Sequence, residues 1–103
     1  MQVIVMQKVK DFNRWKGYFD MDKANRKMHG ATGREAIYQE VNKPNNLIIT
    51  MEWDKRENYE DFFNSPELKA VMEEAGVKEV PSVIVHDSVK GKIEETSMCY
   101  VMM

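Results

Sequence analysis

The first third of the chain carries apolar residues at helical spacing. A helix is predicted from Asp11 to Gly30, because aspartate can cap a first turn and glycine often ends a helix. Its apolar stripe, which should face a core, consists of Phe12, Trp15 and Phe19. The same stripe continues with ionisable residues, namely Asp22, Arg26 and His29. This helix is therefore predicted to be apolar at its start and polar at its end.

Runs of β-branched and other apolar residues predict strands elsewhere in the chain. These runs are residues 2–9, 46–53 and 82–87. A turn at residues 31–33 should lead into residues 34–41, which could be helical by propensity. The turn-forming residues 42–46 instead favour a hairpin that pairs 34–41 with 46–53. Apolar residues occur on both faces of the strands, as with Ile48 beside Ile49, so both faces should be covered.

A second helical stretch is predicted from Arg56 to Gly76. It should be interrupted after Asn64, because Ser65 can cap a new first turn and Pro66 suits the first helical position. The order strand, helix, strand, strand, helix, strand then predicts an α+β fold. Its arrangement is the ferredoxin-like βαββαβ, with a four-stranded antiparallel sheet and the helices on one face.

The open face of this sheet and the C-terminal tail both indicate a partner. An apolar sheet face is typical of an interaction surface, so a homodimer that packs through the sheet face is expected. Residues 1–87 should form the folded domain. The tail at residues 88–103, which is apolar near its end, should pack on the partner subunit or add an edge strand.

Composition excludes several classes of protein. The 103 residues carry a formal charge of −2, which gives no basic surface for nucleic acid. No apolar run approaches the ~20 residues of a membrane span, and no signal peptide is recognisable, so a cytoplasmic protein is expected. The single cysteine, Cys99, has no basic neighbour and is not expected to be a nucleophile. His86 and Asp87 point to opposite faces of a strand, and no metal is expected.

Several short motifs are shared with a known group of small proteins. They are Val9-Lys10-Asp11-Phe12, Trp15-Lys16, Phe19-Asp20, Arg26, Pro44-Asn45, Glu52-Trp53, Phe62, Ser65-Pro66-Glu67-Leu68 and Ala75-Gly76-Val77. This pattern, spread over residues 1–87, resembles the dimeric α/β-barrel superfamily. That superfamily includes the antibiotic-biosynthesis-monooxygenase-like proteins and the stress-responsive barrels. The motifs are specific for the fold and weak for the function.

The resemblance implies a ligand cavity between the sheet and the helices, lined by the first helix. It implies a cofactor-independent monooxygenase-like enzyme that acts on an aromatic or enolisable small molecule. The alternative is a non-catalytic module of the same fold that binds a small apolar ligand or serves in assembly. The sequence departs from the resemblance at Asp22, where relatives often carry a histidine.

The candidate site follows from the first helix and the aromatic residues around it. Arg26 could bind a carboxylate or phenolate, while Asp22 or His29 could move a proton. The competing interpretation is an ion pair between Asp22 and Arg26 on the helix surface, without function. The expected ligand pocket consists of Trp15, Phe19, Tyr38, Trp53 and Phe62. Tyr38 and Tyr59 could also donate hydrogen bonds to a ligand, or lie at the edge of the core with their hydroxyls in solvent.

Overall fold

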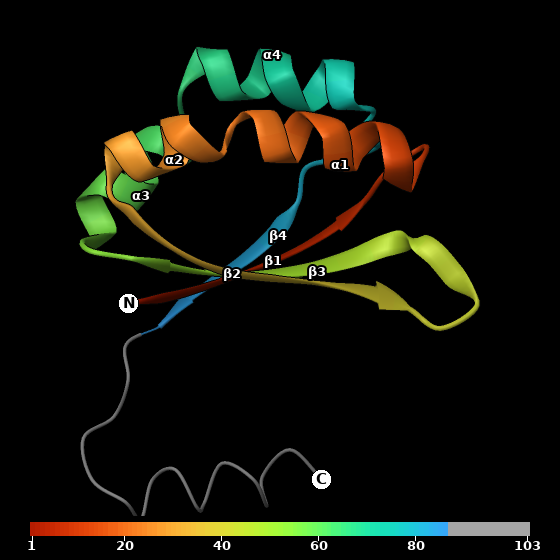
Figure 1. Ribbon diagram of the computed structural model, residues 1–103, viewed down its shortest axis with the longest axis horizontal. Coiled ribbons are helices and arrows are strands. Elements are labelled where there is room, and N and C mark those ends of the chain that lie inside the picture. Colours follow the sequence, from red (N-terminus) through yellow and green to blue (C-terminus); the bar gives the residue numbers. More distant parts are fainter. Residues whose placement is uncertain (87–103) are drawn as a thin grey trace, which may run out of the picture.

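The computed structural model, which describes residues 1–86, has a sheet with helices on one of its faces (Figure 1). Its elements are β1 (Gln2–Lys8), α1 (Phe12–Met21), α2 (Lys23–His29), β2 (Ala31–Glu40), β3 (Lys43–Trp53), α3 (Arg56–Phe63), α4 (Pro66–Ala75) and β4 (Ser82–His86). The strands form one antiparallel sheet in the order β2-β3-β1-β4. The predicted α+β, ferredoxin-like arrangement is confirmed, with each helical connection divided into two short helices.

The first helical connection breaks at Asp22. The sequence predicts one helix from Asp11 to Gly30, and both of its ends are confirmed. The Asp11 carboxylate accepts from a backbone N–H of the first turn at 2.9 Å, and α2 ends at Gly30, whose φ of 129° favours glycine. The prediction of a single unbroken helix is wrong, because the backbone turns at Asp22. At the end of α1, the carbonyl of Phe19 accepts a hydrogen bond from the guanidinium of Arg26 at 2.8 Å.

The second helical connection and the hairpin follow the predicted signals more closely. The Ser65 side chain accepts from a backbone N–H of the first turn of α4 at 3.2 Å, as a cap should. The β2–β3 hairpin forms as predicted, but it turns at residues 41–42 and not across 42–46: Asn42 has a φ of 69°, which asparagine tolerates, and β3 already begins at Lys43. The prediction of a turn at residues 31–33 is wrong. β2 already begins at Ala31, and a register shift between Ala31 and Glu35 marks a bulge within the strand.

Alternation along the strands gives the sheet a buried face and an open face. The core lies between the sheet and the helices, and its buried strand residues are Val3, Val5, Ala31, Leu47, Ile49, Met51 and Trp53. On the other face, Ile48 is 43% exposed and Ile84 is 49% exposed. No helix of residues 1–86 covers that face (Figure 1). The apolar open face predicted from the strand pattern is therefore present.

Some predictions concern residues that the structure does not describe. The path of the tail at residues 88–103 and the surroundings of Cys99 both lie outside residues 1–86. Between Met1 and His86, none of the helices has the length and apolar character that a membrane crossing requires.

Candidate functional site

A small, mostly apolar cavity lies between the sheet and the helix layer. Strands β1 and β3 contribute to it from the sheet, and all four helices contribute from the other side. Its volume is about 80 Å³. In liquid water that volume corresponds to roughly two or three molecules. The aromatic residues that line it are Trp15, Tyr18, Phe19, Tyr59, Phe62 and Phe63.

Arg26 lies at this cavity but is held by other residues of the protein. It is 3% exposed, and its guanidinium makes two hydrogen bonds to the Glu35 carboxylate of β2, at 2.9 and 3.1 Å. A third hydrogen bond reaches the carbonyl of Phe19, and the guanidinium carbon lies 3.7 Å from the centre of the Phe19 ring. The surface ion pair with Asp22 does not form, because the guanidinium is paired with Glu35. Arg26 instead fixes α2 against α1 and β2.

Asp22 and His29 are separated by the helix geometry. Asp22 lines the cavity and is half-buried, and its carboxylate accepts from the side-chain amide of Asn25 at 3.2 Å. His29 is exposed and does not line the cavity. Its Nδ1 lies 2.8 Å from the carbonyl of Asn25, and its ring packs 5.4 Å from that of Phe62. Of the three ionisable residues on the predicted stripe, Asp22 and Arg26 are brought to the cavity and His29 is not.

The predicted pocket residues are also divided. Trp15, Phe19 and Phe62 line the cavity, and Trp15 stacks on Phe19 with ring centres 4.9 Å apart. Trp53 is 1% exposed and lies in the core behind the cavity, against Phe62. The predicted placement of Tyr38 is corrected: it does not line this cavity, because it lies on the open face of the sheet and is 56% exposed. Strand alternation turns Tyr38 away from the helices, whereas Ile37 before it packs against the core.

Two polar residues at the cavity do not appear in the predicted pocket. The side-chain oxygen of Gln7, on β1, is buried without a hydrogen-bond partner among residues 1–86. The hydroxyl of Tyr59, on α3, is in the same situation. Burial raises the pKa of Tyr59 well above its usual value, so the phenol stays protonated. Strand alternation could have placed Gln7 at the cavity, because Gln7 shares the inward face of β1 with Val3 and Val5.

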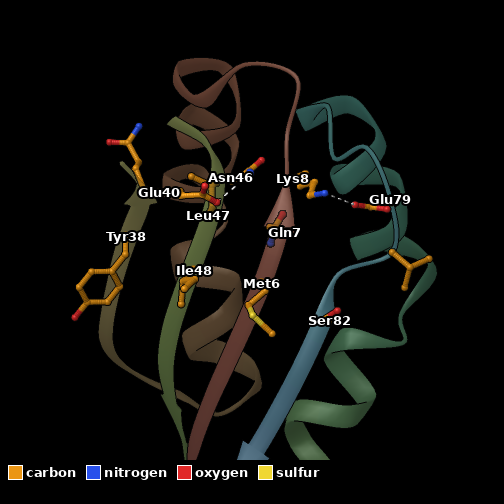
Figure 2. Close-up of a pocket in the computed structure, with 12 residues that line it drawn as sticks. Met6, Gln7, Lys8, Tyr38, Glu40, Asn46, Leu47, Ile48, Glu79 and Ser82 are labelled. Carbon is orange, nitrogen blue, oxygen red and sulfur yellow. Dashed lines mark hydrogen bonds and ion pairs between the residues drawn. The ribbon is translucent and has the colours of Figure 1, made fainter. Parts of the chain in front are cut away.

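The open face of the sheet carries a second and wider hollow (Figure 2). Its volume is about 490 Å³. Figure 2 shows Tyr38, Ile48 and Met6 side by side on three neighbouring strands, and the strand register pairs Ile48 with both of the others. Lys8 and Glu79 form an ion pair at its edge, 3.7 Å apart. The hollow is an apolar strip with a polar rim, and it lies on the face opposite to the cavity.

Metal-binding chemistry finds no support in the part of the chain from Met1 to His86. No group of three or more His, Cys, Asp or Glu side chains lies close enough together there to hold a metal ion. The oxygen-bearing side chains at the cavity are those of Gln7 on β1, Asp22 between α1 and α2, Tyr18 on α1 and Tyr59 on α3.

Comparison with known proteins identifies the fold. No protein-family model matches the sequence, and no curated protein matches it. Among solved structures, a Bordetella bronchiseptica protein assigned to the antibiotic biosynthesis monooxygenases superposes with a TM-score of 0.69 at 16% identity, covering 86% of this chain and 96% of its own. SnoaB, a cofactor-independent oxygenase from Streptomyces nogalater, has a TM-score of 0.65 at 12% identity, covering 88% and 96%. A Nitrosomonas europaea protein with the same assignment as the first has a TM-score of 0.65 at 14% identity, covering 85% and 88%. The chain therefore has the fold of the antibiotic biosynthesis monooxygenases, as the resemblance in its sequence implies.

Proposed function

We propose that this protein is a small cofactor-independent, monooxygenase-like enzyme whose substrate binds in the cavity between the sheet and the helices. The single observation that supports this best is the cavity itself, which is lined by aromatic rings and has the Asp22 carboxylate at its wall. SnoaB, which shares the fold, is described as a cofactor-independent oxygenase. An apolar cavity with one carboxylate suits an aromatic or enolisable molecule that must lose a proton.

Asp22 is the proposed base, since Arg26 is held by Glu35 and His29 lies outside the cavity. Its carboxylate takes a proton from an activated CH₂ group of the substrate. The resulting carbanion transfers electrons to dioxygen, a C–O bond forms, and the peroxide takes the proton back. Loss of water then leaves a carbonyl, so that one oxygen atom enters the product and the other leaves as water. The mostly apolar lining of the cavity favours this sequence, because it offers the carbanion few polar neighbours.

Replacing Asp22 with asparagine should abolish most of the activity. We expect oxygen uptake with a panel of anthrones, quinols and enolisable ketones, and a fall of about 100-fold or more in kcat for Asp22→Asn, as for removal of a general base. Asp20→Asn is the matched control, because Asp20 lies on the same helix, is exposed and pairs with Lys16. Incorporation of ¹⁸O from labelled dioxygen measures the reaction directly. If no substrate of the panel is turned over, the non-catalytic ligand-binding module is the better interpretation.

The proposed partner is a second copy of the same chain, packed through the open face of the sheet. The apolar strip of Met6, Tyr38 and Ile48 supports this, because exposed apolar strips of neighbouring residues are typical of interfaces. In a two-fold dimer each residue of the strip occurs twice, so one substitution acts twice.

Ile48→Glu should therefore convert a dimer into a monomer. Two carboxylates would be buried without partners, and we expect the dimer to weaken by at least ~100-fold. Sedimentation at micromolar concentration should give twice the chain mass for the natural sequence and the single mass for the variant. Met28→Glu is the control, since Met28 is 80% exposed and lies on α2, away from the open face. A natural protein that sediments as a monomer would contradict the proposal.

A further inference from the structure

The junction between α1 and α2 is closed by a side chain. Asp22, which carries the carboxylate proposed as the base, is the residue at which α1 ends and α2 begins. Arg26 of α2 reaches back past this residue and donates from Nη1 to the carbonyl of Phe19 in the last turn of α1, at 2.8 Å. The backbone N–H of Arg26 also donates to the carbonyl of Asp22, at 3.0 Å. The segment from Phe19 to Arg26 is therefore closed by hydrogen bonds, with Asp22 at its middle.

Glu35 fastens this closed segment to the sheet. Its carboxylate, on β2, accepts two hydrogen bonds from the guanidinium of Arg26, one from Nε at 2.9 Å and one from Nη2 at 3.1 Å. The side chain of Arg26 is 4% exposed and that of Glu35 is 10% exposed. Two bonds between a planar guanidinium and a carboxylate fix direction as well as distance. One carboxylate on the sheet therefore determines where the guanidinium lies.

Arg26 in turn fixes the groups next to it at the cavity. Its guanidinium carbon lies 3.7 Å from the centre of the Phe19 ring, and that ring stacks on Trp15 with centres 4.9 Å apart. Asn25, which precedes Arg26 on α2, donates its side-chain amide to the Asp22 carboxylate at 3.2 Å. A shift of α2 would therefore move the amide that orients this carboxylate, together with the aromatic rings beside it.

A buried ion pair is a poor choice for stability alone. Removing two charges from water costs about as much as their attraction returns, and apolar side chains of similar volume often stabilise a protein as well or better. What the pair adds is accuracy of placement. A group that takes a proton needs such accuracy, because a misplacement of roughly 1 Å can lower a rate by about 100-fold. Asp22 lies at a junction of two short helices, where the backbone alone gives little rigidity.

We propose that Glu35 is a positioning residue for the Asp22 base and that it acts through Arg26. This inference rests on the proposed function, because it takes Asp22 as the group that removes the substrate proton. Glu35 does not line the cavity, so its effect on the reaction is indirect. It holds Arg26, and with Arg26 the junction of α1 and α2, in the arrangement that presents the Asp22 carboxylate to the cavity.

The double substitution Arg26→Met with Glu35→Leu separates positioning from stability. It removes the pair without leaving a buried charge, so the protein should keep its fold. We expect kcat to fall by about 10- to 100-fold and KM to change by less than about 3-fold, because the apolar walls that bind the substrate remain. A role in stability alone predicts instead that the rate returns together with the stability. Lys16→Met with Asp20→Leu is the matched control, because it removes an ion pair on the exposed side of α1 and should leave kcat unchanged.

Hydrogen exchange gives a second reading, which needs no substrate. The backbone N–H groups of residues 22 and 26 donate to the carbonyls of Tyr18 and Asp22, on the two sides of the junction. In the double variant, exchange of these two groups should become at least ~10-fold faster, while that of Ile49 in β3 should change by less than about 3-fold.

The other outcomes are distinct. Unchanged exchange at the junction, or a kcat equal to that of the natural protein, would overturn the role of Glu35 while leaving Asp22 as the base. If the natural protein turns over no substrate of the panel, the proposed function fails instead, and the role of Glu35 in the reaction fails with it.

Discussion

Replacing Arg26 with methionine is expected to lower the free energy of unfolding by about 3–5 kcal/mol. The substitution keeps an apolar stem in the space of the arginine but leaves the Glu35 carboxylate, 10% exposed, without its partner. It also removes the donor that satisfies the carbonyl of Phe19 at the end of α1. Urea unfolding followed by circular dichroism measures the change.

The double substitution Arg26→Met with Glu35→Leu distinguishes an unpaired charge from a loss of packing. Most of the lost stability should return, because no buried charge remains in the double variant. Lys16→Met is the matched control, since Lys16 pairs with Asp20 on the exposed side of α1 and should change stability by less than about 0.5 kcal/mol. A loss below about 1 kcal/mol for Arg26→Met would show that the buried pair does not fix α2.

Trp53→Ala should be similarly severe, at about 3–5 kcal/mol, because it removes the largest fully buried side chain of the core. The indole packs 5.4 Å from Tyr59 and 5.3 Å from Phe62, so its removal leaves both rings of α3 without support. The thermal midpoint should fall by more than 10 °C for a domain of this size. Differential scanning calorimetry measures both quantities.

Trp53→Phe should cost clearly less than Trp53→Ala, because a ring of intermediate volume keeps part of the contact with α3. Val41→Ala is the surface control, since Val41 is 82% exposed in the hairpin. Equal losses for Trp53→Phe and Trp53→Ala would mean that ring volume does not set the loss, since the indole N–H has no hydrogen-bond partner among residues 1–86. That outcome would contradict the packing explanation.

Local signals in the sequence were sufficient for most of the fold. Asp11 and Ser65 cap helices as predicted, and the alternation along residues 46–53 places the core face correctly. These features depend on neighbours within a few residues, so spacing alone reveals them. The break at Asp22 is accompanied by a hydrogen bond from Arg26 to the Phe19 carbonyl of the preceding helix. No pattern of polar and apolar residues contains that bond.

The candidate site was less predictable, because its contacts join different elements. The partner of Arg26 is Glu35, which helical spacing within the first helix cannot reveal. A clue existed, since Glu35 and Ile37 share the inward face of β2 and a buried cation needs a carboxylate. Tyr38 was misplaced because residues 34–41 suited a helix as well as a strand. If residues 34–41 are assigned to a strand, alternation places Tyr38 on the open face of the sheet, because Ile37 before it faces the core.

Because each helical connection is divided in two, the helix layer that covers the cavity consists of four short helices. Each has seven to ten residues, which is shorter than a helix that persists by itself in water. Their attachment to the sheet differs: α2 is tied by the Arg26–Glu35 pair, whereas the only buried residue of α4 is Ala75. Local opening of α4 should therefore need less free energy than global unfolding. Opening of α4 would widen the cavity, because four of the residues that line it, Leu68, Val71, Met72 and Ala75, belong to this helix.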